Sequence, residues 1–136
     1  MLEIPVYLIT GFLESGKTTF IREVLASPDF ADGEKTLLLL CEEGEEEYDK
    51  KEYARHNIEI VSVENEEDLT PEYLEYCQKY YRPYRVFVEF NGMWDAKKFS
   101  ESRLPRRWEI VQVITLVDGS TFGVYLANMR SILSNI

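Results

Sequence analysis

The chain has 136 residues, 45% of them hydrophobic, which is the length of one compact domain with enough apolar side chains for a core. Its formal net charge of −10 predicts a surface that repels nucleic acid and anionic membranes, so any anionic ligand needs a local positive site. Its two cysteines, Cys41 and Cys77, lack CxxC spacing, and it has neither a basic leader nor an apolar run near ~20 residues, so we expect a soluble cytoplasmic protein.

Short apolar runs alternate with helical patterns along the chain. The first run, residues 4–10, predicts a strand that stops at Gly11, and a helical pattern follows from Lys17 to about Ala26. A second helix is predicted after Thr70, which is placed as its cap, and it closes at Pro83. Strands of the buried type are predicted at residues 36–41, 85–90 and 110–117, and another short strand at residues 58–63. The polar stretch between 85–90 and 110–117 has room for a short helix.

The last segment carries a helical pattern with no stop signal. Apolar residues from Phe122 to Ile136 follow the 3.6-residue period, and Asp118 or Ser120 is placed to cap the start. Because neither Gly, Pro nor a polar tail ends the pattern, we expect the chain to be the front part of a longer domain. A sheet that stops early would expose an apolar edge, which predicts self-association.

Strands that alternate with helices favour an α/β fold of three layers. We expect an open, mainly parallel sheet of five strands joined by right-handed crossovers, with about three helices covering both of its faces. The carboxyl ends of parallel strands then share one edge, which is where such sheets bind ligands.

Residues 11–18 read GFLESGKT and satisfy the pattern G-x-x-x-x-G-K-[ST] between a predicted buried strand and a helix. Gly11 and Gly16 can adopt positive φ, which lets the N–H groups of the loop, those of Glu14 and Ser15 included, converge on phosphate oxygens. The positive end of the following helix adds to this attraction. The segment therefore predicts a phosphate-binding loop.

Three residues at the start of that helix complete the predicted site. Lys17 would reach the β- and γ-phosphate oxygens, the Thr18 hydroxyl would be a ligand of Mg²⁺, and Thr19 would contact the α-phosphate. The alternative is a glycine turn that only joins strand to helix. We disfavour it because a lysine directly after the second glycine has little other use.

Six carboxylates follow the second predicted strand: Glu42, Glu43, Glu45, Glu46, Glu47 and Asp49. Their position at the carboxyl edge predicts a switch loop that orders around a magnesium nucleotide, with Glu42 the best placed as a metal ligand. A solvated acidic loop is the alternative, and the sequence leaves both open.

Glu89 ends the apolar run VFV, so its carboxylate is expected to emerge at the carboxyl edge and to face the phosphate loop if its strand lies beside the first. There it would hold Mg²⁺ through water or orient the attacking water. Gly92 allows a tight turn, and its N–H would approach the γ-phosphate. For Glu89 the alternative is simple strand termination, and for Asp118 helix capping is favoured.

The order of these motifs resembles that of the CobW-type GTPases, which include the metallochaperone and cobalamin-synthesis proteins. The resemblance spans nearly the whole chain: IPVYLITGFLESGKTTFIREVL is similar to the family's opening strand and phosphate loop, LLLLCEEGEEEYD to its second strand and acidic loop, VFVEFNGMWD to its second nucleotide motif, and VITLVDGSTF to the strand that follows. It implies GTP binding, slow Mg²⁺-dependent hydrolysis, and delivery of a metal or cofactor to a client protein.

The chain departs from the family pattern in two places. Residues 50–69 contain no cysteine where the family has its CxCC metal motif, so a thiolate site for a transition metal is not expected. The base-reading N-K-x-D segment and the client-binding domain of the family are also absent from residues 1–136, which would then be a partial GTPase domain. GTP is therefore expected from the resemblance alone.

Two other functions remain compatible with the sequence. One is a nucleotide-responsive binding module that hydrolyses little and signals by ordering its acidic loop. The other is an ATP-using P-loop transferase, which would prefer adenine and transfer phosphate to an acceptor.

Overall fold

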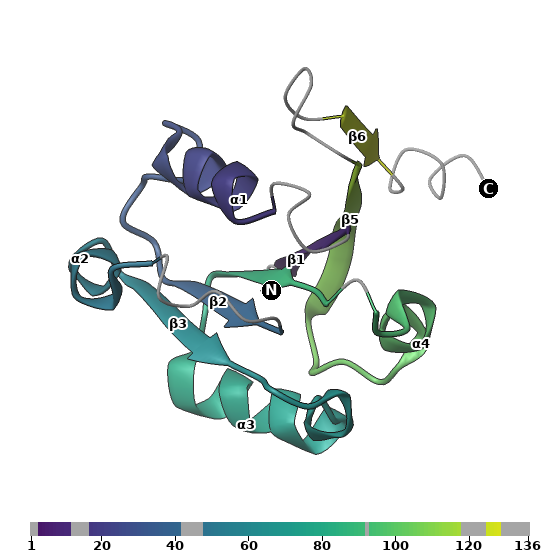
Figure 1. Cartoon of the computed structure of the whole chain (residues 1–136). Coiled ribbons are helices and arrows are strands. Elements are labelled where there is room, and N and C mark those ends of the chain that lie inside the picture. The colour runs from purple at the N-terminus through teal and green to yellow at the C-terminus, as the bar shows by residue number, and fades with distance from the viewer. Residues whose placement is uncertain (1–2, 12–16, 42–47, 92, 118–124, 129–136) are drawn as a thin grey trace.

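The computed structural model describes residues 3–11, 17–41, 48–91, 93–117 and 125–128. Strands and helices alternate along the chain (Figure 1). In chain order they are β1 (Ile4–Gly11), α1 (Lys17–Ala26), β2 (Thr36–Leu40), α2 (Lys50–Arg55), β3 (Ile58–Ser62), the 3₁₀ helix η2 (Glu66–Asp68), α3 (Pro71–Tyr81), β4 (Arg85–Glu89), α4 (Ala96–Glu101), β5 (Trp108–Val117) and β6 (Tyr125–Asn128).

The strands form one six-stranded sheet in the order β3-β2-β4-β1-β5-β6. The first five are parallel to their neighbours, and β6 runs antiparallel to β5. This confirms the predicted α/β fold with a mainly parallel sheet. The order places β4, a late strand in the sequence, directly between β2 and β1.

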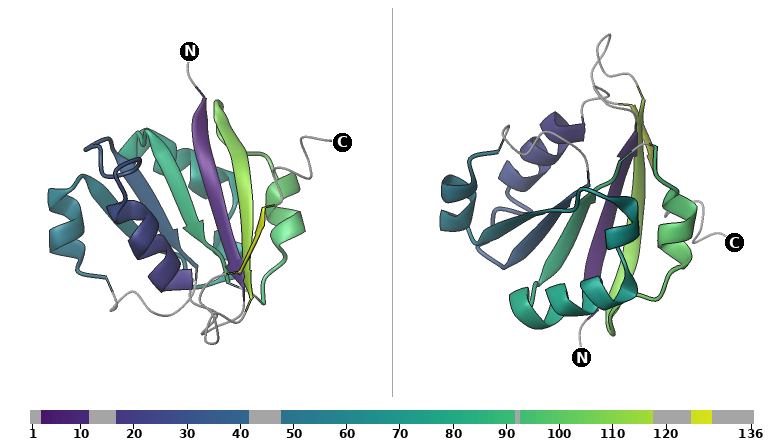
Figure 2. Two further views of the ribbon diagram at one scale, coloured as in Figure 1. Left: turned by 90° about the horizontal axis from the view of Figure 1, so that it is seen from above. Right: turned by 60° about the horizontal axis from the view of Figure 1, so that its bottom comes forward.

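Two apolar clusters cover the two faces of the sheet, which gives the three layers visible in Figure 2. On one face Ile21 and Leu25 of α1, one helical turn apart, pack against alternate strand residues. On the other face Leu74 and Cys77 of α3 and Phe99 of α4 do the same. All five residues of β2 are buried, as expected for a strand that is covered on both sides.

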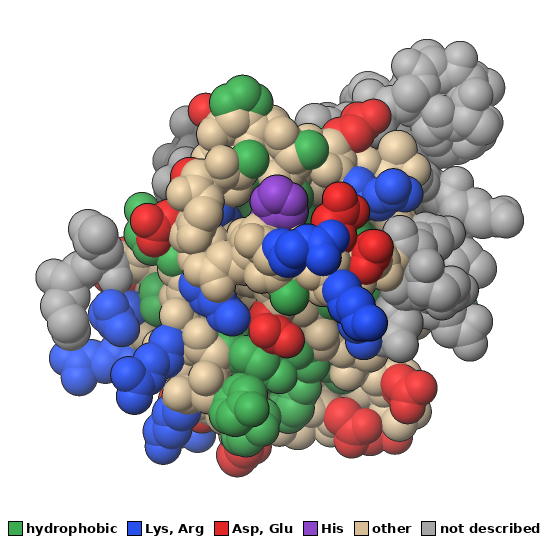
Figure 3. Space-filling view, turned by 90° about the vertical axis from the view of Figure 1, so that its left-hand side faces the viewer, with side chains coloured by type: hydrophobic (Ala, Val, Ile, Leu, Met, Phe, Trp, Pro, Cys, Tyr) green, Lys and Arg blue, Asp and Glu red, His purple; other side chains and the backbone are tan. Residues whose placement is uncertain are grey.

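The predicted start of α3 is also confirmed. The Thr70 side chain accepts a hydrogen bond from the Tyr73 backbone N–H at 3.0 Å, and Pro71 occupies the first turn. The helix ends at Tyr81, two residues before Pro83. Tyr76 and Tyr80 are exposed on this helix, and their rings stack at 5.5 Å. Figure 3 shows hydrophobic side chains gathered at the bottom of the molecule, the end at which α3 lies in Figure 1.

The prediction of a helix from Phe122 is wrong at Tyr125–Asn128, which form strand β6. The remaining residues of that pattern, and the proposed caps Asp118 and Ser120, lie outside the described residues. The physical reason is that β5 offers a row of backbone N–H and C=O groups on its outer side, and pairing from Val117↔Tyr125 to Ile114↔Asn128 satisfies them. This long-range pairing overrides the local helical period.

Helix α2 was not predicted from the sequence. Its N-cap is Asp49, whose side chain accepts hydrogen bonds from the backbone N–H groups of Lys51 and Glu52.

Candidate nucleotide-binding site

The site lies at the carboxyl edge of the sheet, where β1 and β4 end side by side. The two strands are parallel, with Ile9 opposite Glu89 in the register. β1 ends at Gly11, whose φ of 144° is a conformation that favours glycine. The first residue of α1 is Lys17. The predicted phosphate-loop segment therefore follows a strand and leads into a helix, as expected.

Lys17 is buried, with only 3% of its surface exposed. Its ammonium donates hydrogen bonds to the backbone oxygen of Gly11 at 2.5 Å and to that of Phe90 at 3.3 Å. A buried charge is costly unless it is hydrogen-bonded, and these carbonyls supply partners from the ends of two adjacent strands. The fold therefore holds a positive charge at the carboxyl edge of a strongly acidic chain.

Thr18 and Glu89 meet beside that charge. The Thr18 hydroxyl donates to Glu89 Oε1 at 2.7 Å, although the two residues are 71 positions apart in the sequence. Glu89 is 1% exposed, and its strand position is fixed because the Phe90 N–H donates to Ile9 O at 2.7 Å and the Cys41 N–H donates to Glu89 O at 3.0 Å. β4 thus lies beside β1 as expected, and Glu89 contacts Thr18 in the first turn of α1, while residues 12–16 of the predicted loop lie outside the described part of the chain.

Tyr48 also contacts this cluster, which the sequence did not predict. Its buried hydroxyl lies 3.4 Å from Glu89 Oε1, and its ring packs edge-on against Tyr53 of α2 at 5.4 Å. Burial, together with the nearby Glu89 carboxylate, raises the pKa of the Tyr48 hydroxyl above its usual value. The hydroxyl therefore stays protonated and available as a donor. The position of Tyr48 within the acidic run, between Glu47 and Asp49, did not indicate this contact.

The structure describes some of the predicted site residues and not others. Gly11, Lys17, Thr18 and Glu89 lie close together, while Thr19 is exposed on α1. The remaining predicted residues lie outside the described part of the chain, namely Glu14, Ser15, Gly16, Glu42 and Gly92.

The donor atoms of this cluster fit Mg²⁺ better than a soft transition metal. Mg²⁺ takes oxygen ligands and keeps several waters and phosphate oxygens, so the Thr18 hydroxyl and the Glu89 carboxylate suffice on the protein side. Within the described residues there is no group of three or more His, Cys, Asp or Glu side chains that could hold a metal ion. Both cysteines are buried and outside any such group.

A known family model covers nearly the whole chain. The model of the CobW/HypB/UreG nucleotide-binding domain matches residues 5–133. The chain belongs to this family. The CobW/HypB/UreG domain is a nucleotide-binding P-loop domain of a GTP-binding family, and its match runs from the second residue of β1 to beyond β6.

No curated protein and no solved structure matches this CobW/HypB/UreG chain in the same comparisons. Among the helices in the described part of the chain, none has the length and apolar character needed to cross a membrane.

Proposed function

We propose that this chain binds GTP with Mg²⁺ at the carboxyl ends of β1 and β4 and hydrolyses it slowly. The observation that carries the proposal is the convergence of a buried ammonium, a hydroxyl and a buried carboxylate, from Lys17, Thr18 and Glu89, at the edge where the phosphate-loop pattern lies. Family membership supports the nucleotide, and the resemblance of the motifs supports guanine as its base.

Lys17 would bind the terminal phosphates. Its ammonium has three donors, and two of them are held by the Gly11 and Phe90 carbonyls, which fixes the charge at the carboxyl ends of β1 and β4. Phosphate oxygens would take the place of carbonyl partners or share the ammonium with them. Because the side chain is positioned before the nucleotide arrives, little conformational entropy would be lost on binding.

Thr18 would exchange one partner for another when the magnesium nucleotide binds. Its hydroxyl donates to Glu89 in this structure, and as a metal ligand it would turn its oxygen lone pair to the ion. When bound, Mg²⁺ supplies positive charge that offsets charge developing on the phosphate oxygens. Glu89 would then accept from an ordered water, while the Tyr48 hydroxyl keeps the carboxylate oriented.

We expect the intrinsic rate to be low, because Lys17 is the only cation that these contacts bring to the described part of the site. Efficient phosphoryl transfer in this class uses an additional positive charge, often an arginine supplied by a partner. Coupling of the cycle to metal or cofactor delivery to a client protein, and self-association of the chain, remain part of the proposal.

The test compares the wild-type protein with Lys17→Ala and with Lys51→Ala, a control at an exposed lysine of α2. Calorimetry with a non-hydrolysable GTP analogue and Mg²⁺ should show binding that weakens about tenfold to a hundredfold in Lys17→Ala, from the loss of one or more charge-assisted hydrogen bonds. The control should bind as the wild type does. Circular dichroism would establish that the Lys17 variant is folded.

Phosphate release over many turnovers distinguishes the alternatives. Repeated GTP turnover that depends on Mg²⁺ supports a GTPase, and binding with a single turnover or none favours the nucleotide-responsive module. Preference for ATP over GTP in competition would overturn the guanine assignment. Equal affinity of wild type and a folded Lys17→Ala variant would refute the site itself.

A further inference from the structure

Helix α3 has a row of tyrosine rings on its outer side. Tyr76 and Tyr80 are 53% and 68% exposed, the highest values among the described aromatic residues. The rings of Tyr73, Tyr76 and Tyr80 stack one after another, at 6.2 Å and then 5.5 Å between ring centroids. Figure 3 shows hydrophobic side chains gathered at the end of the molecule where α3 lies. These three residues are called the tyrosine row below.

The stacking limits what can bind to the tyrosine row. Tyr76 has a stacked ring on each side, and Tyr80 also has Tyr81 edge-on at 4.8 Å. The ring faces are therefore largely occupied by one another, which leaves little open face for a base or a sugar. The exposed parts are mainly ring edges and hydroxyl groups, which suit packing against the surface of another protein.

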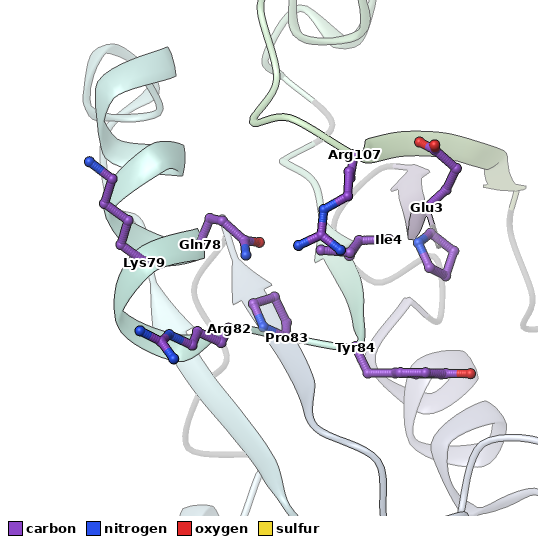
Figure 4. Close-up of a pocket in the computed structure, with 9 residues that line it drawn as sticks. Glu3, Ile4, Gln78, Lys79, Arg82, Pro83, Tyr84 and Arg107 are labelled. Carbon is purple, nitrogen blue, oxygen red and sulfur yellow. The ribbon is translucent and has the colours of Figure 1, made fainter. Parts of the chain in front are cut away.

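Two opposite charges lie beside the tyrosine row. Glu72 is in the first turn of α3 and Lys79 in the last, and both side chains are exposed. No ion pair formed among the described residues includes either of them. Figure 4 shows the Lys79 ammonium pointing away from Arg107 and from the pocket at the amino edge of the sheet. The outer face of α3 therefore has a negative end and a positive end.

These residues are arranged so that an antiparallel copy of the helix matches them. At about 100° per residue, Glu72 and Lys79 lie about 40–60° to one side of Tyr76, and the other two tyrosines lie as far to the opposite side. A two-fold axis placed about half a residue past Tyr76 sets Tyr73 level with Tyr80 of the second copy. The same axis sets Glu72 within about 3 Å, along the helix, of Lys79 of the second copy. Tyrosines then face tyrosines, and each Glu72 faces a Lys79.

From this symmetry we propose that the outer face of α3 binds a second copy of the chain, with the two helices antiparallel in a two-fold homodimer. The charges select this occupant, because a wholly basic or wholly acidic partner would meet a like charge at one end of the face. An antiparallel copy neutralises both ends. It thereby offsets part of the repulsion expected between two chains of net charge −10.

The size and position of the face set the properties of the dimer. A single helix face buries less than the roughly 1,200–2,000 Å² of a standard interface, so we expect a weak dimer with a micromolar dissociation constant. The face is a helix surface, unlike the sheet edge from which self-association was expected. It lies on the opposite side of the sheet from α1, so the dimer does not depend on the proposed nucleotide function.

Sedimentation velocity of the nucleotide-free protein, from about 5 to about 500 μM, covers the range of such a dimer. The sedimentation coefficient of the wild type should rise with concentration. Tyr76→Ala should weaken dimerisation at least about tenfold, because aromatic residues at the centre of an interface carry much of the binding energy. Tyr84→Ala, at an exposed tyrosine outside α3, is the matched control and should dimerise as the wild type does. Lys17→Ala should also dimerise normally, so failure of the nucleotide proposal would leave this one testable.

Glu72→Lys and Lys79→Glu test the antiparallel pairing. Each variant alone places like charges opposite each other twice, which should weaken dimerisation at least about tenfold. An equimolar mixture of the two variants should associate again, because one copy then presents two positive charges and the other two negative charges.

Glu67→Lys on η2 and Lys97→Glu on α4 are the controls, since they change the net charge equally at exposed positions away from the face. Both should dimerise as the wild type does, and circular dichroism would establish that every variant is folded. The proposal is overturned if the wild type stays monomeric throughout the concentration range or if Tyr76→Ala dimerises as the wild type does. It is also overturned if the mixture of charge variants associates no better than either variant alone.

Discussion

Replacing Tyr48 with phenylalanine removes one hydroxyl group from the candidate site and leaves the ring that packs against Tyr53. In the nucleotide-free protein the cost should be small, because the contact with Glu89 Oε1 is long at 3.4 Å and the shorter Thr18 hydrogen bond remains. We expect a loss of about 0.5 kcal/mol in the free energy of unfolding, the lower end for one hydrogen bond.

The effect on turnover should be much larger. In the proposed reaction Thr18 leaves Glu89 to bind the metal ion, so the buried carboxylate then depends on Tyr48 for its orientation. A hydrogen bond to a charged group contributes about 1.5–3 kcal/mol, which corresponds to a fall in kcat of about tenfold to a hundredfold.

The assay is phosphate release at saturating GTP and Mg²⁺, with denaturant unfolding of the nucleotide-free protein alongside. Tyr53→Phe is the matched control, since it removes a neighbouring hydroxyl that is not placed on Glu89. A kcat within twofold of wild type for Tyr48→Phe would refute the exchange of partners. The exchange would also be refuted if the free energy of unfolding fell by as much as the activation free energy of turnover rose, because Tyr48 would then be a structural residue only.

Three further outcomes are expected from the fold. Thr70→Ala should lower the free energy of unfolding by about 1 kcal/mol in denaturant titrations, because the Tyr73 N–H loses its cap, and Thr70→Ser should restore most of it. Burial raises the pKa of the Cys77 thiol from 9.0 to about 11, so the folded state keeps a proton that the unfolded state releases. Stability should therefore be unaffected by this group below pH 9 and fall by about 2 kcal/mol as the pH rises to 11, a slope that Cys77→Ala reduces. The hydrogen bond from Arg85 lowers the pKa of Asp32 from 3.8 to about 2, so the stability it contributes is present above pH 3.8 and is lost as the pH falls toward 2. Asp32→Asn should remove that part of the acid dependence in the same titrations.

Local sequence signals predicted the parts of the site that are close together in the chain. The strand, the glycine loop and the helix that begins at Lys17 are consecutive, so composition and spacing suffice to define them. The same holds for the Thr70 cap, where the hydroxyl and its backbone donor are three residues apart. The position of Glu89 at a strand end was also readable, because strand ends follow from the apolar run.

The sheet order decided the rest. Thr18 meets Glu89 only because β4 inserts beside β1, and Tyr48 reaches the same carboxylate across 41 positions of sequence. The helical period from Phe122 was misleading because β5 offered Tyr125–Asn128 a strand partner that no local pattern records.

By itself, the sequence determined the fold class, the phosphate-loop segment and the family, since each depends on short-range periodicity and on an ordered set of motifs. Only the tertiary structure showed that the Tyr48 hydroxyl lies beside Glu89 and that Thr18 and Glu89 meet at the carboxyl edge of the sheet. Such contacts join segments far apart in the chain, and they are fixed by which strands pair and which helices cover them, a choice made by the packing of the whole core rather than by any local run of residues.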